Sequence, residues 1–134
     1  MTIRSSSEAE TQAAAARLAP RLRPGDLVRL EGPLGAGKTC FVRGVLRAIG
    51  WESSVRSPTF NLIQVYPTSP PVVHADLYRL SSAAGLGLEE YGETHVCLVE
   101  WADRLGETSG GREWRVTISF DGQGRRIDIE GPDA

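Results

Sequence analysis

The feature that most constrains this chain is residues 32–39, which read Gly-Pro-Leu-Gly-Ala-Gly-Lys-Thr. They fit the pattern G-x-x-x-x-G-K-[ST], a loop whose backbone N–H groups surround the phosphates of a nucleotide. We call residues 32–39 the phosphate loop. Its glycines allow positive φ angles and a close approach to phosphate oxygens. Lys38 offers a compact positive charge to the β- and γ-phosphates, and the Thr39 hydroxyl suits Mg²⁺.

The segments on either side of the phosphate loop have the patterns that the motif requires. Residues 27–31 are rich in β-forming side chains and follow a Pro-Gly-Asp turn, so they predict a strand. After the loop, apolar residues recur at helical spacing until Gly50 ends the pattern. Strand, loop and helix in this order favour a phosphate-binding loop over the alternative, a chance glycine-rich turn.

The choice of basic residues points to the same loop. The chain has 15 Lys and Arg residues, 14 of them Arg, and the single lysine is Lys38. The compact ammonium group of lysine fits among the backbone amides of such a loop better than the planar guanidinium of arginine does. The one exception to the use of arginine therefore falls where the motif needs a lysine.

Length and composition bound the remaining possibilities. With 134 residues, 40% of them hydrophobic and 24% charged, the chain predicts one globular domain over residues 1–134, without a second substrate domain. The formal net charge of −2 gives no overall attraction for nucleic acid, so we expect no DNA partner, and we expect another protein to hold any RNA that is involved. The chain shows neither a membrane-spanning apolar run nor a signal-peptide core, so we expect no membrane association and a cytoplasmic location.

The cysteines and histidines give no sign of a zinc site. Cys40 and Cys97 lie far apart in apolar segments and form no C-x-x-C pair, so we predict two buried thiols in a reducing compartment. His74 and His95 have no metal-ligand spacing. We therefore assign no zinc to this chain.

The rest of the sequence predicts further helices and strands. Ser7 and Glu10 form a capping-box signature, which predicts a helix from residue 8 to about residue 22. Residues 61–66 and 72–78 flank a proline-rich turn and predict an antiparallel hairpin. We also predict a short helix within residues 82–91, a buried strand at 96–99, and a terminal hairpin of residues 114–120 and 125–130.

Hydrolysis of a bound nucleotide needs a carboxylate near the metal and a group that positions water. The apolar run at residues 96–99 ends in Glu100 and has the shape of a Walker B strand. A carboxylate at an ordinary strand end gives the same pattern, so that alternative stays open. Asp76 is a second candidate, and its alternative is an ion pair with Arg79.

Three other positions have both a functional and a structural interpretation. Residues 57–60, Ser-Pro-Thr-Phe, fit a switch loop that senses the γ-phosphate, or a proline turn with its phenylalanine in the core. Trp101 fits a cover over the nucleotide or an ordinary core residue. Glu10 and Thr11 fit either a contact with the base or a solvated helix face.

These pieces, in this order, resemble the TsaE family, also called YjeE, of small bacterial ATPases in tRNA threonylcarbamoyladenosine synthesis. The phosphate loop alone occurs in many unrelated proteins, but its combination with the later segments is specific. The resemblance runs from about residue 5 to the last hairpin. The matching segments are Glu10-Thr11, Gly25-Asp26, residues 32–39, residues 57–60, the H-x-D-L-Y-R-L segment at residues 74–80, and Val99-Glu100-Trp101.

The resemblance implies an α/β, P-loop NTPase-like three-layer fold with a mixed central sheet. It also implies a Mg²⁺-dependent ATPase that binds ATP and ADP, hydrolyses ATP slowly alone, and acts with TsaB and TsaD homologues. In this family TsaD transfers the threonylcarbamoyl group to tRNA. Hydrolysis of ATP by the TsaE subunit is expected to reset the complex between turnovers.

Roles carry over from the family by position. The resemblance makes Lys38, Asp76 and Glu100 catalytic, with Thr39 and Glu100 at the metal. Thr59 would sense the γ-phosphate, while Pro33 stands where the family often has an acidic residue. The nucleotide-binding residues it implies are Glu10, Thr11, Pro33, Leu34, Gly35, Ala36, Gly37, Lys38, Thr39, Cys40, Thr59 and Trp101.

Two other functions stay open at this point. One is a small-molecule kinase, although the chain has little material for a lid. The other is a nucleotide-sensing adaptor that binds without hydrolysis. A transition-state arginine would be Arg43, Arg56 or Arg79, or would come from a partner. Arg43, Arg47 and Arg56 otherwise fit a basic docking face or plain solvated surface.

Overall fold

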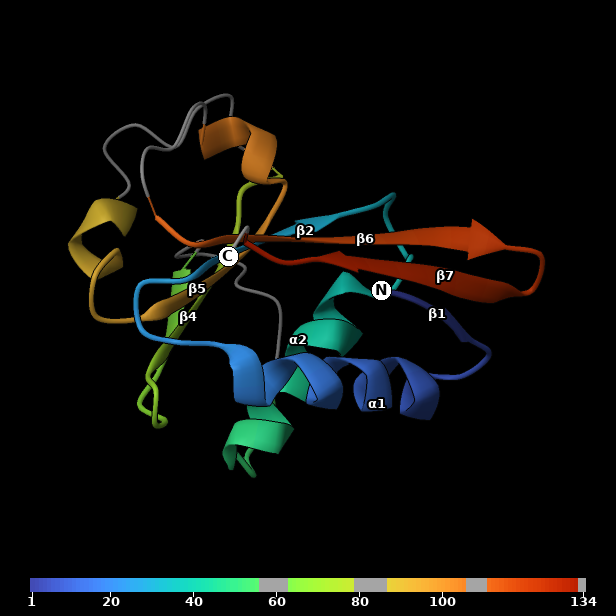
Figure 1. Ribbon diagram of the computed structural model, residues 1–134, viewed down its shortest axis with the longest axis horizontal. Coiled ribbons are helices and arrows are strands. Elements are labelled where there is room, and N and C mark those ends of the chain that lie inside the picture. The colour runs from blue at the N-terminus through green and yellow to red at the C-terminus, as the bar shows by residue number, and fades with distance from the viewer. Residues whose placement is uncertain (56–62, 79–86, 106–110, 133–134) are drawn as a thin grey trace.

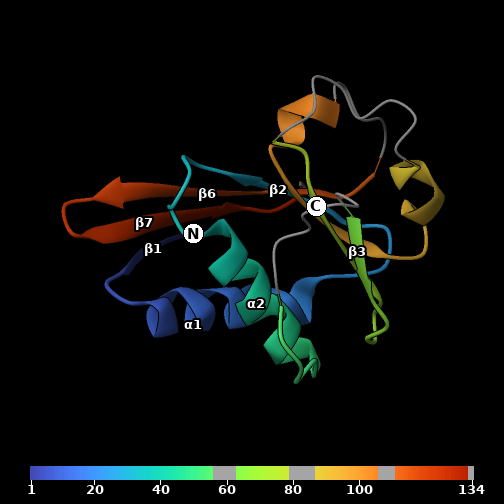
Figure 2. The same ribbon diagram turned by 180° about the vertical axis from the view of Figure 1, so that it is seen from behind.

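The computed structural model describes residues 1–55, 63–78, 87–105 and 111–132. Its centre is a seven-stranded sheet in the order β1-β7-β6-β2-β5-β4-β3. Figures 1 and 2 show α1 and α2 on one side of this sheet and two short 3₁₀ helices on the other. The elements are β1 (Thr2–Ser5), α1 (Glu8–Leu18), η1 (Ala19–Arg21), β2 (Leu27–Glu31), α2 (Lys38–Ile49), β3 (Ile63–Tyr66), β4 (Val72–Asp76), η2 (Leu88–Tyr91), β5 (Val96–Glu100), η3 (Ala102–Leu105), β6 (Glu113–Asp121) and β7 (Gly124–Glu130).

The sheet mixes parallel and antiparallel pairs. Strand β2 pairs in parallel with both β5 and β6, and β4 pairs in parallel with β5. The pairs β3–β4, β6–β7 and β1–β7 are antiparallel. The predicted α/β class with a mixed central sheet is therefore confirmed, and so are both predicted antiparallel hairpins.

The parallel strands set the position of the phosphate loop. Leu30 of β2 and Asp76 of β4 are both register partners of Glu100 at the end of β5. The carboxyl ends of these strands therefore meet at one edge, where ligands bind in open α/β sheets. The phosphate loop follows β2 at that same edge.

Differences from the sequence-based predictions have local causes. The first helix ends at Leu18 and continues as η1, because Pro20 cannot donate the hydrogen bond that another α-helical turn needs. Strand β1 was not predicted, since its four residues are too few for a periodic pattern and its partner β7 lies at the other end of the chain. Strand β4 ends at Asp76, two residues earlier than expected. Residues 61–62 and 82–86 lie outside the described part.

Two hydrophobic clusters occupy the two faces of the sheet. One lies under the α-helices and includes Phe41, Leu46 and Trp114. The other lies under the 3₁₀ helices and includes Val99 and Leu88. Strands β4 and β5 are buried on both faces, which explains their nearly continuous apolar sequences. Among the described residues, no helix is long and apolar enough to cross a membrane.

Helices α1 and α2 approach each other closely at Gly44. A Cβ atom placed on Gly44 would lie 2.7 Å from Cα of Gln12 and 2.8 Å from Cβ of Ala15. Only glycine fits this contact without a shift of one helix. The alanine-rich centre of α1 supplies the matching small side chains.

Asp26 is buried at the amino end of β2 and is fully used by structural contacts. Its carboxylate accepts hydrogen bonds from the N–H of Arg23, from Nε1 of Trp114 and from the guanidinium of Arg112, the shortest at 2.7 Å. Trp114 and Arg112 belong to β6 and the residues just before it. Asp26 thus ties β2 to β6 at the edge opposite the phosphate loop.

Candidate nucleotide-binding site

The phosphate loop has the backbone geometry that its glycines predict. Gly32, Gly35 and Gly37 have φ angles of 147°, 80° and 115°. A Cβ on Gly32 would lie 2.2 Å from the carbonyl oxygen of Ile118 in β6, so the loop can start only with glycine. Pro33 accepts a hydrogen bond from the N–H of Ala36 at 3.2 Å, a turn in which its own missing N–H has no consequence.

Helix α2 starts directly from this loop. Gly37 is its N-cap residue and has no side chain to satisfy the first-turn N–H groups. Such groups have no acceptor within a helix, and the helix dipole adds positive potential at the same end. The start of α2 is therefore suited to an anion.

Lys38 is folded back over the phosphate loop. Its Nζ donates to the carbonyl oxygen of Gly32 at 2.6 Å and lies 4.1 Å from the ring centroid of Trp101. Burial lowers the pKa of the Lys38 ammonium, and the carboxylates of Glu100 and Asp76 oppose that shift. A phosphate would relieve this desolvation by giving the ammonium an anionic partner.

Thr39 and Glu100 meet beside Lys38. The Thr39 hydroxyl donates to Oε2 of Glu100 at 3.4 Å, and Glu100 is 4% exposed. Asp76 is the register partner of Glu100 on the neighbouring strand, and its carboxylate accepts the N–H of Tyr78 at 3.1 Å. The structure thus brings together four of the predicted site residues, Lys38, Thr39, Asp76 and Glu100.

These side chains suit Mg²⁺ better than a softer metal. A hydroxyl and two carboxylates are hard oxygen donors, and Mg²⁺ usually keeps several waters while using one or two carboxylates and the phosphates of its nucleotide. Within the described ranges, no group of three His, Cys, Asp or Glu side chains could hold a metal ion by itself. The arrangement fits an ion that arrives with a nucleotide.

His74 also contacts this site, although the sequence analysis assigned it no role there. Its Nε2 lies 2.6 Å from Oε2 of Glu100, and the ring is fully buried. In the sequence it stands out only as a histidine without metal-ligand spacing and as the first residue of the H-x-D-L-Y-R-L segment. The signal that could have found it is the two-residue separation from Asp76, because residues i and i+2 of a strand share one face.

Trp101 has an unusual backbone at the edge of the site. Trp101 has a φ angle of 58°, and among the described residues it is the non-glycine residue whose φ is positive. Its ring packs on Tyr78, with centroids 4.9 Å apart, as well as on Lys38. Strained backbone of this kind is typical of functional sites, and here it directs the indole over the lysine.

A pocket of about 210 Å³ adjoins the phosphate loop. Thr11 lines it and shares a hydrogen bond of 2.7 Å with Ser5, whereas Cys40 lines it with its thiol directed at the carbonyl of Glu8. Glu10 is not among the lining residues, and its carboxylate accepts the N–H of Ser6, just before the N-cap Ser7, at 2.6 Å. The lining residues are Ser5, Ser6, Ser7, Glu8, Thr11, Gly35, Ala36, Gly37, Cys40, Gln123, Gly124 and Arg125.

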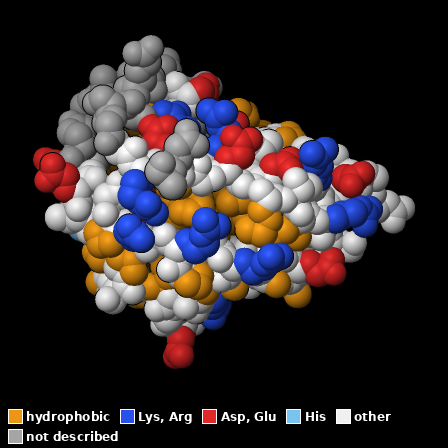
Figure 3. All heavy atoms as spheres, viewed as in Figure 1, with side chains coloured by type: hydrophobic (Ala, Val, Ile, Leu, Met, Phe, Trp, Pro, Cys, Tyr) orange, Lys and Arg blue, Asp and Glu red, His pale blue; other side chains and the backbone are white. Residues whose placement is uncertain are grey.

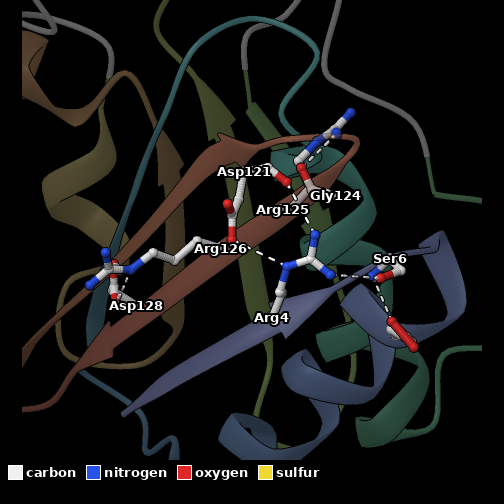
Figure 4. A network of polar contacts seen from close by, with 8 residues as sticks. Arg4, Ser6, Asp121, Gly124, Arg125, Arg126 and Asp128 are labelled. Carbon is white, nitrogen blue, oxygen red and sulfur yellow. Dashed lines mark hydrogen bonds and ion pairs between the residues drawn. The ribbon is translucent and has the colours of Figure 1, made fainter.

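Arg125 is a second residue that sequence reasoning missed. Its Nε donates to the carbonyl of Ala36 at 3.0 Å, and Nη2 donates to that of Gly35 at 3.4 Å. Figure 4 shows the guanidinium of Arg125 near Gly124, apart from the neighbouring surface contacts that Arg4 and Arg126 make. The hairpin of β6 and β7 is therefore fastened to the phosphate loop by one side chain.

Several predicted positions have other surroundings or lie outside the described residues. Arg43 donates to the carbonyl of Val55 and Arg47 to that of Glu52. Cys40 and Cys97 are buried and free, as predicted, and burial raises the pKa of Cys97 to about 11. Residues 57–60 with Thr59, and also Arg56 and Arg79, lie outside the described part.

The surface agrees with the small net charge. In Figure 3, acidic side chains lie along the upper part and the edges of the visible face, and basic side chains are spaced across its middle among hydrophobic ones. Non-specific binding to nucleic acid usually needs clustered Lys and Arg. This face therefore has no such footprint among the described residues.

Comparisons with known proteins agree with one another. A family model described as threonylcarbamoyl adenosine biosynthesis protein TsaE matches residues 5–127. The tRNA threonylcarbamoyladenosine biosynthesis protein TsaE of Bacillus subtilis is 40% identical over 120 residues, which cover 87% of this chain and 76% of the relative. The protein of the same name from Streptomyces coelicolor is 45% identical over 112 residues, covering 78% and 74%. A crystal structure of YdiB from Bacillus subtilis matches with a TM-score of 0.84 and 34% identity, covering 99% of this chain and 86% of that one.

Proposed function

The chain belongs to the TsaE family of threonylcarbamoyl adenosine biosynthesis proteins, and on that basis we propose that it is the Mg²⁺-dependent ATPase subunit of this tRNA modification. In this proposal it binds ATP and hydrolyses it to support turnover of a complex of TsaB and TsaD homologues. The complex, rather than this subunit, contacts tRNA. A cytoplasmic location follows from that role.

The observation that carries the proposal is the contact between Thr39 and Glu100 beside Lys38. These three groups come from the start of α2 and the end of β5, which the parallel pairing of β2 and β5 brings to one edge. A lysine that binds phosphate, without an acid on the metal side, would support nucleotide binding but not hydrolysis. Adding the hydroxyl and the carboxylate gives the arrangement that phosphoryl transfer uses.

Each residue has a separate task in hydrolysis. Lys38 leaves the carbonyl of Gly32 and holds the β- and γ-phosphate oxygens. Thr39 and Glu100 would hold Mg²⁺, which when bound neutralises charge on those oxygens. Asp76, the register partner of Glu100 on β4, would orient the attacking water. The water oxygen forms a bond to the γ-phosphorus, the bond to the β–γ bridging oxygen breaks, and ADP and phosphate leave.

The proposal also accounts for slow turnover by the isolated subunit. An arginine that stabilises the transition state often contributes several powers of ten in rate. Arg43 donates to the carbonyl of Val55, and Arg125 donates to carbonyls of the phosphate loop itself, so both guanidinium groups already have backbone partners. We therefore expect docking on the TsaB and TsaD homologues to complete the site.

The first test is Lys38→Ala, measured by calorimetric titration with Mg-ADP. We expect the variant to lose at least about 100-fold in affinity, because the charge-assisted contact with the β-phosphate of ADP is removed. Arg47→Ala is the matched control, since Arg47 lies at the far end of the same helix and contacts Glu52. Equal binding by native chain and Lys38 variant would refute the proposed site.

The second test separates an ATPase from a nucleotide-sensing adaptor. Single-turnover release of ADP is followed after the native chain is mixed with TsaB and TsaD homologues and tRNA. ADP release that keeps pace with tRNA modification supports the ATPase. Modification that depends on bound ATP without ADP release would instead identify an adaptor.

A further inference from the structure

His74 lies beneath the proposed metal site, on the same face of the sheet. It is on β4, two residues before Asp76, and its register partner on β5 is Leu98, two residues before Glu100. Because side chains alternate along a strand, all four residues face α2. His74 therefore occupies the layer below the two carboxylates, toward the core.

The imidazole makes one hydrogen bond and leaves one nitrogen unused. Nε2 lies 2.6 Å from Oε2 of Glu100, while Nδ1 is buried and has no partner among the described residues. A proton on Nδ1 would be a buried donor without an acceptor, which costs about 1–3 kcal/mol. The tautomer with hydrogen on Nε2 avoids this, so Nε2–H donates to Glu100.

This hydrogen bond fixes how Glu100 presents its oxygens. The Nε2–H of His74 and the hydroxyl of Thr39 both reach Oε2. Among the residues that the structure describes, no hydrogen bond reaches Oε1. Oε2 is therefore shared by His74 and Thr39, and Oε1, which is not among the buried unpaired atoms of the described residues, is the oxygen left for a cation bound by the nucleotide.

Resting on the function proposed above, we propose that His74 is a positioning residue for the metal side of the site, holding Glu100 by one oxygen so that the carboxylate meets Mg²⁺ in a fixed orientation. The residue acts through Glu100 and touches neither nucleotide nor metal. Groups that orient a metal ligand typically contribute about 10–100-fold in metal affinity. A buried pair that only fills space would contribute nothing specific to Mg²⁺.

Two amide substitutions separate these possibilities. In His74→Gln the side-chain amide nitrogen lies near the place of Nε2, so a donor to Glu100 is kept. In His74→Asn the amide reaches only as far as Nδ1, so that donor is lost while a neutral polar group stays. Both variants remove the ring, which makes them a matched pair for packing.

The experiment measures ADP affinity by calorimetry, once with Mg²⁺ and once with EDTA, for the native chain and both variants. We expect His74→Asn to lose about 10-fold of the gain in affinity that Mg²⁺ provides, and His74→Gln to stay within about 3-fold of native. Affinities in EDTA should agree for all three proteins. Three results would each overturn the inference. His74→Asn could keep the native gain in ADP affinity from Mg²⁺, both variants could lose that gain equally, or the loss of ADP affinity could be as large in EDTA as in Mg²⁺.

A measurement on the native chain keeps the inference testable if a variant does not fold. Two-bond proton–nitrogen correlation spectra identify which ring nitrogen of His74 carries hydrogen. We expect hydrogen on Nε2, and hydrogen on Nδ1 alone would overturn the inference. Absence of any ADP binding by the native chain would refute the proposed function itself, whereas native binding with an unaffected Asn variant would refute only the role of His74.

Discussion

Two carboxylates, Asp26 and Glu100, are buried at opposite ends of the parallel strands, and their hydrogen bonds differ in kind. Asp26 accepts from one backbone N–H, one indole and one guanidinium, so both of its oxygens are used. Glu100 accepts from His74 and Thr39, and both bonds converge on one oxygen. Their exposures, 1% and 4%, hardly differ.

The difference separates a structural acid from an acid with capacity left for a ligand. A buried carboxylate whose acceptor positions are filled holds elements together and has little left to offer. A carboxylate with an oxygen left over still has an acceptor to offer to a cation. The two acids also occupy opposite edges of the sheet, and only the carboxyl edge is the usual place for ligands.

The largest effect that we expect from this comparison is on folding. Asp26→Ala should lower the free energy of unfolding by roughly 3 kcal/mol, because the indole N–H of Trp114 and the charge of Arg112 lose their partner. Urea denaturation measures this, with Asp26→Asn as a control that keeps an acceptor. A loss below about 1 kcal/mol would remove the structural half of the comparison.

A slightly smaller effect is expected at Glu100, and in activity rather than stability. Glu100→Gln should slow single-turnover hydrolysis in the assembled complex by about 100-fold, since an oriented charge at the phosphates is lost. Its free energy of unfolding should change by less than about 1 kcal/mol, because the amide oxygen can still accept from His74. Glu113→Gln is the control, because Glu113 on β6 forms an ion pair with Arg29 on β2. Native turnover in the Glu100 variant would contradict the assignment.

The smallest effect concerns Arg125, which donates to backbone carbonyls and forms no ion pair within the described residues. Arg125→Ala should weaken Mg-ADP binding by about 5-fold, because the two carbonyls that it holds belong to the phosphate loop and each such bond is worth about 1 kcal/mol or less. Arg126→Ala is the matched control, since that exposed side chain pairs with Asp128 on the surface. Equal affinities of the two variants for Mg-ADP would show that the hydrogen bonds of Arg125 to the phosphate loop do not contribute to nucleotide binding.

Local patterns in the sequence predicted much of the fold. The phosphate loop, β2, α2 and both hairpins each depend on residues that are close in the chain. What could not be predicted depends on distant pairs. Strand β1 pairs with β7 across the whole length of the chain, and Arg125 reaches the loop 89 residues before it.

The candidate site shows the same division. Lys38, Thr39, Asp76 and Glu100 were predicted and lie together, although their individual roles stay predictions until tested. The contact of His74 with Glu100 was not predicted, because the two residues are on different strands. Asp26 and Glu100 both belong to the segments that resemble the family, yet the sequence could not show that one is saturated by structural contacts and the other is not.

The close contact at Gly44 limits how helices α1 and α2 can move relative to each other. Helix α1 lines the pocket with its first residues, whereas α2 starts at the phosphates, and the two are in backbone-to-backbone contact through Gly44 and Gln12. Neither can slide or roll independently of the other. Under the proposed function, any opening and closing around ATP would originate elsewhere, because the start of α1 and the start of α2 would move as one rigid unit.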